Sequence, residues 1–494
     1  MKNEKLLITD FDGCLTNEFN LDEAMVNLLI LNEVYDIVIS TGREYGTMEK
    51  LISRKDFWKY VKMIILANGC VTISKQETKY AYLSWEEKEN VMKMVRELQV
   101  FYYGVELYFS LPEKTIYIDD MDFAMIQLEN PIYEIKIAVP LQEKMILNWI
   151  LNYTSYKDMN AFVDIVTNKG YYYMEIKSKG VNKFNAVGEF VKREKYKQLY
   201  TLGDDVNDIH LFCFGIPAKK FTTNEKLKLQ GLKLIKDCKN LVLDSGENLS
   251  SIYTNNKVVA FRHVVCKVFA NSNQYQIEKE AYQIVDPMYR PNLIGTIEEE
   301  STLFVERCKI PKSLCLEQLI PMMNRYHQST SREGEIYELG GVVRYPSWED
   351  YLLAQLREWE ETMKFYVTNV SQQIESLKKY ISAVRPKRKQ VSLIHRDIRL
   401  DNIGELNGCY VLFDYERAMW GNPIWDFARL FYEVECEEDK QAIYELSGYT
   451  KKELHIHRCL YAFSFLHYFY SAEYQNRKEI EKCKRIIKEF EHEV

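Results

Sequence analysis

Two aspartates one residue apart, Asp10 and Asp12, are the first side chains whose spacing suits chemistry. They follow a short apolar run, Leu6–Thr9, which predicts a buried parallel strand ending in a turn. Side chains two apart in a strand share a face, so both carboxylates can address one small volume beyond the strand. One carboxylate can attack phosphorus while the other moves a proton, and both can approach a hard cation. An ordinary strand with an acidic turn would also fit this stretch alone.

Other polar residues follow further predicted strands in the first half of the chain. Thr41, with a glycine after it, can donate hydrogen bonds to a phosphate oxygen. Lys183 stands at the predicted start of a helix, where its ammonium group could neutralise an attacking carboxylate and a transferred phosphoryl group. A later strand ends in clustered carboxylates that include Asp204 and Asp208, and these repel one another unless a divalent cation lies between them. Magnesium is the natural cation for an oxygen-only site beside a phosphate.

A parallel sheet is needed to bring these residues together. The stretch 72–171 has its own alternation of strands and helices, and we expect it to form an inserted α+β cap. The apolar segment Tyr173–Ile176 is expected to resume the core sheet. The core is therefore predicted at 1–71 and 172–235.

In this order, the motifs resemble the Cof-like branch of the haloacid dehalogenase (HAD) phosphatase superfamily. The resemblance rests on Asp10-x-Asp12-Gly13, Thr41-Gly42-Arg43, Asn68-Gly69, Lys183 and Gly203-Asp204-x-x-Asn207-Asp208. It implies an α/β Rossmann-like HAD domain with the larger α+β cap. It also implies that Asp10 is the nucleophile that becomes an aspartyl-phosphate and that Asp12 is the general acid/base. The implied phosphate ligands are Thr41 and Lys183, and the implied magnesium ligands are Asp10, Asp12 through its backbone carbonyl, and Asp204, supported by Asn207 and Asp208.

The second half carries a different constellation, centred on His395-x-Asp397-x-x-x-x-Asn402. This spacing places a carboxylate that can receive a hydroxyl proton five residues before an amide that can bind metal. A second apolar strand then delivers Asp414 toward the same metal ions. The spacing is specific and rarely arises by chance.

Lys267, upstream of this loop, lies inside a predicted hairpin strand, where an unpaired ammonium group would be costly. The helix expected at Tyr275–Val285 carries Glu278 and Glu280. A strand lysine paired with a helix glutamate is how kinases hold the α/β-phosphates of a nucleotide, although a half-exposed edge lysine would also fit. Glu306 follows another predicted strand, Thr302–Val305, and could form part of an adenine-binding hinge.

With the segment Gly421–Arg429, this second set resembles the aminoglycoside phosphotransferase and choline kinase family. The resemblance implies a two-lobed α+β protein-kinase-like domain, with an N-lobe at 240–310 and a C-lobe at 311–494. Within the C-lobe, one long helix is expected at Asp350–Ile381. The roles implied by the resemblance are catalytic base for Asp397, magnesium ligands for Asn402 and Asp414, and orientation of ATP for Lys267 with Glu280.

Two departures from this family stand out. Arg396 gives a His-Arg-Asp sequence typical of protein kinases, and the segment Gly246–Tyr253 before Lys267 has only one glycine. Only eleven residues separate Asp414 from Asp426, however, and no Ala-Pro-Glu follows. That stretch is too short for the activation segment of a protein kinase, so a small-molecule acceptor fits better.

The whole-chain composition limits the possible functions. The 494 residues suffice for two to four domains, and the net charge of −7 provides no basic field to hold nucleic acid. The eleven cysteines form no Cys-x-x-Cys pair, and we recognise no signal peptide, which favours reduced thiols and the cytoplasm. No apolar run approaches the roughly 20 residues of a membrane span.

We therefore predict a bifunctional cytoplasmic enzyme: a magnesium-dependent phosphatase joined to an ATP-dependent phosphotransferase. The expected partners are a small-molecule phosphate ester and a small-molecule hydroxyl acceptor, with no membrane. Two alternatives stay open. The first is a nucleic-acid end-healing phosphatase and kinase, for which the basic loop Arg385–Lys389 is the only support. The second is a nucleotide-binding regulatory protein, suggested by the missing glycine-rich loop but opposed by Asp397, Asn402 and Asp414.

Overall fold

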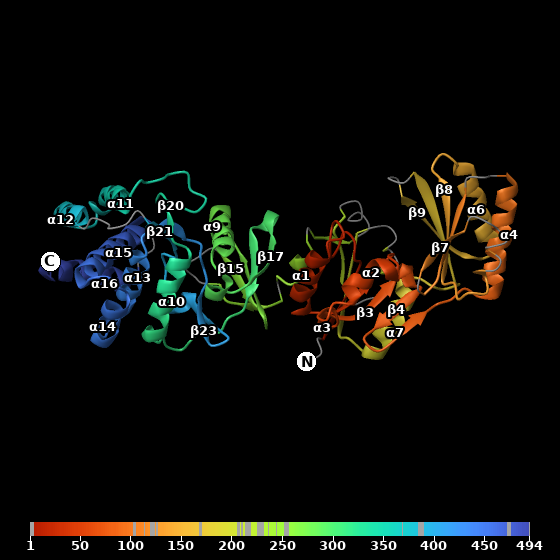
Figure 1. The fold of residues 1–494 in the computed structure, drawn as a ribbon, viewed down its shortest axis with the longest axis horizontal. Helices are drawn as coiled ribbons and strands as arrows, with labels where there is room; N and C mark the ends of the chain where they lie inside the picture. The colour runs from red at the N-terminus through yellow and green to blue at the C-terminus, as the bar shows by residue number, and fades with distance from the viewer. Residues whose placement is uncertain are drawn as a thin grey trace. The chain divides into compact units, whose positions relative to one another are not determined.

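The computed structural model divides into two compact units, Met1–Gly246 and Glu247–Val494, which we describe separately (Figure 1). The residues that the structure describes are 4–101, 105–112, 114–118, 124, 127–166, 170–204, 208, 211–212, 219–224, 232–235, 237–243, 245–250, 256–367, 369–383, 390–471 and 476–493. Among these, no helix combines the length and the apolar character that crossing a membrane requires.

An eight-stranded sheet with the order β13-β12-β11-β1-β2-β3-β4-β5 forms the centre of the first unit. Its strands are β1 (Lys5–Thr9), β2 (Asp36–Ser40), β3 (Val61–Leu66), β4 (Val71–Ser74), β5 (Thr78–Tyr80), β11 (Gln198–Gly203), β12 (Lys219–Thr222) and β13 (Lys233–Leu234). The six strands from β13 to β3 pair in parallel, whereas β4 and β5 pair antiparallel. Since Thr9 lies opposite both Ile39 and Leu202, the carboxyl ends of β1, β2 and β11 meet at one edge.

In the described part of this core, four helices and two short 3₁₀ segments accompany the sheet. They are α1 (Leu21–Asn32), α2 (Tyr45–Ile52), α3 (Phe57–Tyr60), α7 (Lys183–Glu194), η1 (Ala67–Gly69) and η4 (Cys238–Leu241). The side chain of Asn20 accepts hydrogen bonds from two backbone amides at the start of α1, and Asn182 caps α7 in the same way. The cap at Asn182 makes Lys183 the first residue of α7, as the sequence predicted.

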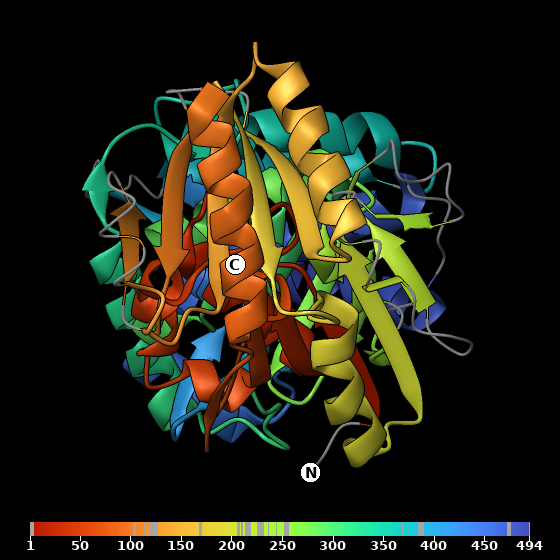
Figure 2. The same cartoon turned by 90° about the vertical axis from the view of Figure 1, so that its right-hand side faces the viewer.

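The inserted cap is a five-stranded antiparallel sheet with the order β7-β6-β8-β10-β9. Its elements are α4 (Trp85–Phe101), β6 (Glu106–Ser110), β7 (Thr115–Ile118), β8 (Glu134–Pro140), α6 (Lys144–Tyr156), β9 (Asn160–Val166) and β10 (Tyr171–Lys177). Figure 2 shows α4 and α6 in front of one face of this sheet. Apolar side chains from that face and from both helices form a hydrophobic core belonging to the cap alone.

The placement of β10 corrects the predicted cap boundary. The sequence suggested that Tyr173–Ile176 resumes the core sheet at 172, but β10 pairs with β8 and β9 inside the cap. Its residues alternate, with Met174 and Ile176 in the cap core and Glu175 among polar groups on the other face. Such alternation is typical of an antiparallel strand with one covered face rather than a doubly buried parallel strand. The stretch from β4 to β5, expected in the cap, belongs to the core sheet instead.

The second unit begins with a five-stranded antiparallel sheet in the order β14-β15-β16-β18-β17. This N-lobe contains β14 (Glu247–Asn248), β15 (Lys257–Ala260), β16 (Val264–Val268), α9 (Ser272–Ile284), η5 (Pro287–Tyr289), β17 (Leu293–Ile297), η6 (Glu298–Glu300) and β18 (Thr302–Glu306). It starts at Glu247 rather than 240, because residues 239–241 pack on the first unit. There Lys239 donates to Asn27, and Tyr35 donates to the carbonyl of Leu241.

The C-lobe is mainly helical. Its elements are α10 (Leu316–Ser329), β19 (Arg332–Glu333), β20 (Tyr337–Glu338), α11 (Trp348–Met363), α12 (Val370–Ala383), β21 (Gln390–Ile394), η7 (Leu400–Asn402), β22 (Ile403–Leu406), β23 (Cys409–Leu412), β24 (Met419–Gly421), α13 (Ile424–Glu433), α14 (Glu437–Leu446), α15 (Lys451–Ser471) and α16 (Arg477–Glu493). The single helix expected at Asp350–Ile381 is wrong, since it divides into α11 and α12. The aromatic and β-branched run Phe365–Val367 favours helix weakly, and Asn369 adopts a left-handed conformation with φ of 62°.

Candidate active sites

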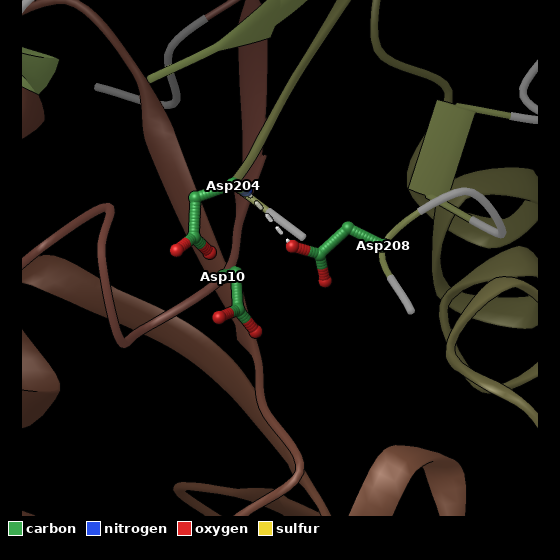
Figure 3. A group of neighbouring side chains, drawn as sticks. All are labelled: Asp10, Asp204 and Asp208. Carbon is green, nitrogen blue, oxygen red and sulfur yellow. Dashed lines mark hydrogen bonds between the residues drawn. The ribbon is translucent and has the colours of Figure 1, made fainter. Parts of the chain in front are cut away.

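Three carboxylates converge at the edge of the core sheet where β1 and β11 end (Figure 3). The oxygens of Asp10, Asp204 and Asp208 lie within 4.8 Å of one another. Asp208 also accepts a hydrogen bond of 3.0 Å from the backbone nitrogen of Asp204, which holds the two residues together. Gly13 is necessary beside this group, because a Cβ there would lie 1.9 Å from an Asp204 oxygen, and its φ of +67° is left-handed. Asn207, implied as a supporting residue, lies outside the described residues.

Lys183 joins two of these carboxylates. Its ammonium group lies 2.7 Å from Asp10 and 2.5 Å from Asp208, and the side chain is only 2% exposed. Burial by itself lowers the pKa of Lys183, but the two aspartates raise it above its ordinary value, so the lysine stays charged. The position at the start of α7 therefore gives the cluster one buried positive charge.

The electrostatics of the cluster fit a divalent cation. Burial raises the pKa of Asp10, Lys183 lowers it, and Asp208 and Asp204 raise it again, leaving it well above its ordinary value. Lys183 thus does not offset the effect of burial and of the neighbouring carboxylates on Asp10. A divalent ion would add positive charge beside Asp10, and Asp10 with Asp204 and Asp208 present the donor atoms that magnesium prefers.

Asp12 points to a partner that sequence reasoning missed. Arg43 donates two hydrogen bonds of 2.6 Å, one to each carboxylate oxygen of Asp12, and its guanidinium stacks 4.0 Å from the ring of Phe19. Asp12 stays 40% exposed at its side chain, at the rim of the cluster rather than within it. Thr41 is buried and its hydroxyl accepts a hydrogen bond from the backbone of Arg43. No local sequence pattern pairs Arg43 with Asp12, because the two residues come together only through the parallel pairing of β1 with β2.

A network of buried charges joins the cap to the core next to this site. Glu44, the residue after Arg43, contacts Thr115 of the cap and lies 2.6 Å from Lys136. Deeper in the cap, Glu134 is completely buried, 3.3 Å from Lys136 and 3.5 Å from Lys177. Burial raises the pKa of Glu134 to about 7 despite these lysines. The network therefore contains a carboxyl group that titrates near neutral pH.

Glu134 should make the stability of the first unit depend on pH. Because its pKa is raised in the folded state, its stabilising contribution is complete below the ordinary value of 4.5 and is lost as pH rises through about 7. We expect calorimetry from about pH 5 to about pH 8 to show the unfolding temperature of wild type falling by roughly 3 °C or more relative to Glu134→Gln. The exposed cap residue Glu129, changed to Gln, should follow wild type. Parallel curves for wild type and Glu134→Gln would contradict the assignment.

A cluster of charged side chains in the second unit forms around Lys267. This ammonium group contacts Asp414 and lies 2.8 Å from Glu278 and 3.1 Å from Glu416. The three carboxylates lie within 4.8 Å of one another. Burial lowers the pKa of Lys267, but Asp414, Glu278 and Glu416 raise it above its ordinary value. Lys267 is therefore a charged, paired strand lysine and not a half-exposed edge residue.

The helix partner of Lys267 is Glu278, which corrects the choice of Glu280. Residues two apart on a helix lie about 200° apart around its axis, so only one of them can face the strand. Tyr275, Ala281 and Tyr282 are buried and share the face of Glu278, whereas Glu280 is partly exposed on the other side. This apolar spacing was the signal that should have selected Glu278. Glu416, one residue beyond Tyr415, was missed.

Asp397 is held by Asn402 and by a buried arginine. The amide of Asn402 donates to the Asp397 carboxylate at 3.1 Å and to its backbone carbonyl at 2.9 Å. Arg429, only 2% exposed, lies 3.0 Å from the other carboxylate oxygen. Burial raises the pKa of Asp397, but Arg429, Arg399 and Arg417 together bring it below its ordinary value. Asp397 is therefore ionised and oriented, as a proton acceptor must be.

Asp426 shapes the loop that carries Asp397. Its fully buried carboxylate accepts hydrogen bonds of 2.8 Å and 2.7 Å from the backbone of His395 and Arg396, and lies 2.9 Å from the ring of His327. Arg396 has a left-handed φ of 71°, so these bonds hold a strained turn in place.

Glu306 lies at the end of β18, where its carboxylate accepts a hydrogen bond of 2.8 Å from the side chain of Asn292. A role in binding adenine stays a prediction. The basic loop Arg385–Lys389 lies outside the described residues, as do residues 251–255 of the segment that precedes Lys267.

Two family models match separate parts of the chain. Residues 7–214 match the model of the haloacid dehalogenase-like hydrolases, and residues 315–454 match the phosphotransferase enzyme family. A search of curated proteins found no match.

Solved structures resemble each half separately. A haloacid dehalogenase-like hydrolase from Bacteroides thetaiotaomicron is 15% identical over 47% of this chain and 93% of its own, with a TM-score of 0.37. A HAD subclass IIB sugar phosphatase is 14% identical over 48% and 95%, with a TM-score of 0.36. A thermostable mutant of an aminoglycoside phosphotransferase is 17% identical over 51% and 98%, with a TM-score of 0.41.

The fold class expected from the sequence is confirmed: a Rossmann-like HAD domain with an α+β cap precedes a two-lobed kinase-like domain. The chain therefore joins a domain of the haloacid dehalogenase-like hydrolase family, over residues 7–214, to a domain of the phosphotransferase enzyme family, over residues 315–454.

Proposed function

We propose that the first unit is a magnesium-dependent phosphatase that hydrolyses small phosphate esters through an aspartyl-phosphate at Asp10. The observation that carries this proposal is the convergence of Asp10, Asp204 and Asp208 around Lys183 at one sheet edge. Magnesium held by these aspartates would supply positive charge that keeps Asp10 ionised and stabilises the transferred phosphoryl group. Lys183, 2.7 Å from Asp10, would contribute to the same stabilisation.

The residues divide the chemistry into two displacements. A carboxylate oxygen of Asp10 attacks phosphorus, the bond from phosphorus to the alcohol oxygen breaks, and Asp12 gives the leaving alkoxide a proton. Asp12 then takes a proton from water, whose oxygen attacks the aspartyl-phosphate and releases inorganic phosphate and free Asp10. Arg43, bound to both oxygens of Asp12, holds this acid/base at the rim where the alcohol leaves.

For the second unit we propose ATP-dependent phosphoryl transfer to the hydroxyl of a small molecule. The supporting observation is Asp397, ionised and fixed between Asn402 and Arg429. Asp397 accepts the hydroxyl proton while the acceptor oxygen bonds to the γ-phosphorus and ADP leaves. Lys267 would bind the α/β-phosphates, and Asp414 with Asn402 would hold magnesium, which screens the charge of the transferred group.

The Lys267 pair can be tested with two neighbouring glutamates. Because Glu278 contacts Lys267, Glu278→Gln should lower kcat/KM for ATP by about tenfold or more, as a buried ammonium loses a charged partner. Glu280→Gln makes the same chemical change on the opposite helix face and should stay within about twofold of wild type. Steady-state ATP consumption with a saturating acceptor measures both. A larger decrease for Glu280→Gln than for Glu278→Gln would instead support Glu280, the residue predicted from the sequence, as the partner of Lys267.

We also propose that the protein works in the cytoplasm, since every cysteine in the described ranges is a free thiol. The direct test of both activities is one panel of compounds. Phosphate release is measured from phosphorylated sugars, nucleotides and alditols with magnesium, and ATP consumption is measured with the dephosphorylated forms. A product of one unit that serves as substrate of the other would make the protein a two-step metabolic enzyme. Silence of both units on the whole panel would overturn the proposal.

A further inference from the structure

The cap sheet leaves one face uncovered by α4 and α6. On β6, Leu107 and Phe109 fill the cap core, so Glu106, Tyr108 and Ser110 share the opposite face. The same alternation puts Tyr117 of β7 and Tyr171 and Tyr173 of β10 on that face, because Ile116, Ile118, Met174 and Ile176 pack in or against the cap core. We call the four residues Tyr108, Tyr117, Tyr171 and Tyr173 the tyrosine group.

The tyrosine group gathers around a single carboxylate. Tyr108 donates a hydrogen bond of 2.6 Å to one oxygen of Glu106, and Tyr171 donates one of 3.4 Å to the other. The ring of Tyr117 lies 5.3 Å from that of Tyr108, and the ring of Tyr173 lies 6.2 Å from that of Tyr171. The hydrogen bond to Glu106 raises the pKa of Tyr108, which keeps its hydroxyl protonated as the donor.

Glu106 has no cation of its own in the part of the chain that the structure describes. Its hydrogen-bond partners there are the hydroxyls of Tyr108 and Tyr171. Glu106 and both tyrosines are partly exposed. A carboxylate among aromatic rings is the arrangement that proteins use to bind an ammonium group, through charge attraction and the negative faces of the rings. A third hydrogen-bond donor can still reach Glu106, because a carboxylate offers about four lone-pair sites. The charge and the rings thus complement a cation.

The same face leads to the phosphatase site. Ser110, four residues from Glu106 on β6, lies 3.5 Å from Glu44, and Lys136 lies 2.6 Å from Glu44. Glu44 directly follows Arg43, which binds Asp12. Four residues of a strand span about 13 Å, so Glu106 lies well beyond the reach of a single-ring alcohol esterified at Asp10. An occupant that touches both ends must be elongated.

We propose that this face of the cap binds the alcohol part of an elongated phosphate ester that carries an ammonium group at its far end. Glu106 and the tyrosine group receive the ammonium group while the phosphate lies at Asp10 and Lys183. This inference rests on the proposed phosphatase function of the first unit and names its substrate class.

The test uses matched esters on the full-length protein. Aminoalkyl monophosphates with about two to ten carbons are compared with hydroxyalkyl monophosphates of equal length, and kcat/KM is measured for each. For wild type, the amine-to-hydroxyl ratio of kcat/KM should be near one for short chains and rise to about tenfold or more for long ones. Glu106→Gln should return the ratio to about one, whereas Glu129→Gln, an exposed cap residue with the same change in charge, should keep it.

A second variant guards against damage to the fold. Tyr117 is 52% exposed, so Tyr117→Leu should fold normally and lower the long-chain ratio several-fold. Hydrolysis of p-nitrophenyl phosphate, which lacks the amine, should be unchanged in Glu106→Gln and in Tyr117→Leu. If wild type does not hydrolyse p-nitrophenyl phosphate, the proposed phosphatase function fails and the inference with it. If it does, but the ratio is independent of chain length or of Glu106, only the inference is overturned.

Discussion

Replacing Asp10 with asparagine should lower phosphate release from p-nitrophenyl phosphate by at least about a thousandfold. The amide is nearly isosteric with the carboxylate but is not a nucleophile, so the first displacement stops. Lys183 would still contact Asp208 at 2.5 Å, which should keep the buried cluster folded. Phosphate release with magnesium in excess measures the effect.

Asp22→Asn is the matched control, because Asp22 makes a surface ion pair with Arg54 and lies outside the cluster. Its rate should equal that of wild type. The kinase reaction should be unchanged in both variants, since it uses other residues. A rate for Asp10→Asn within about tenfold of wild type would remove Asp10 from the role of nucleophile.

Replacing Asp397 with asparagine should lower phosphoryl transfer from ATP by about a hundredfold to ten-thousandfold. The amide cannot take the hydroxyl proton, yet it can keep one hydrogen bond to Asn402. Nucleotide binding should persist, because Lys267, Glu278 and Asp414 are unchanged, and a shift of the unfolding temperature with ATP reports it. We therefore expect Asp397→Asn to lower the rate of ATP consumption without weakening ATP binding.

Asp401→Asn tests whether the effect belongs to Asp397 itself. Asp401 is exposed and lies in the same loop, so its substitution should leave the rate within about twofold of wild type. If Asp397→Asn and wild type bind ATP equally and neither transfers phosphate to any acceptor, the second unit would be a nucleotide-binding regulatory module instead.

The sequence could predict which polar residues at the ends of strands lie close together. Asp10, Lys183 and Asp204 each follow an apolar strand or open a helix, and parallel strands bring such positions to one edge. The spacing from Asp397 to Asn402 also predicts a contact, because a short loop limits which side chains can meet, and the two side chains are hydrogen-bonded. These predictions needed local sequence and one topological rule.

Pairings between distant elements were harder to predict. Arg43 reaches Asp12 because β1 and β2 are neighbours, and Arg429 reaches Asp397 from α13; neither pairing has a local signature. The confusion of Glu278 with Glu280 was different, because helical spacing already contained the answer. The predicted return of Tyr173–Ile176 to the core sheet is wrong, because polar Tyr173, Glu175 and Lys177 alternate with apolar residues, as in a strand with one covered face.

Because the cap has its own hydrophobic core, we expect the cap to unfold locally as a unit. The cap core and the core around Leu6, Ile8 and Val38 share no residue, so the cap can lose its structure as one cooperative segment while β1 and β11 stay intact. Amide protons of β6, β8 and β10 would then exchange with deuterium together and earlier than those of β1. Glu44 pairs with Lys136 at the base of the cap, and Lys136 also pairs with the buried Glu134. We therefore expect this local unfolding to become more frequent when the ion pair between Glu44 and Lys136 is removed.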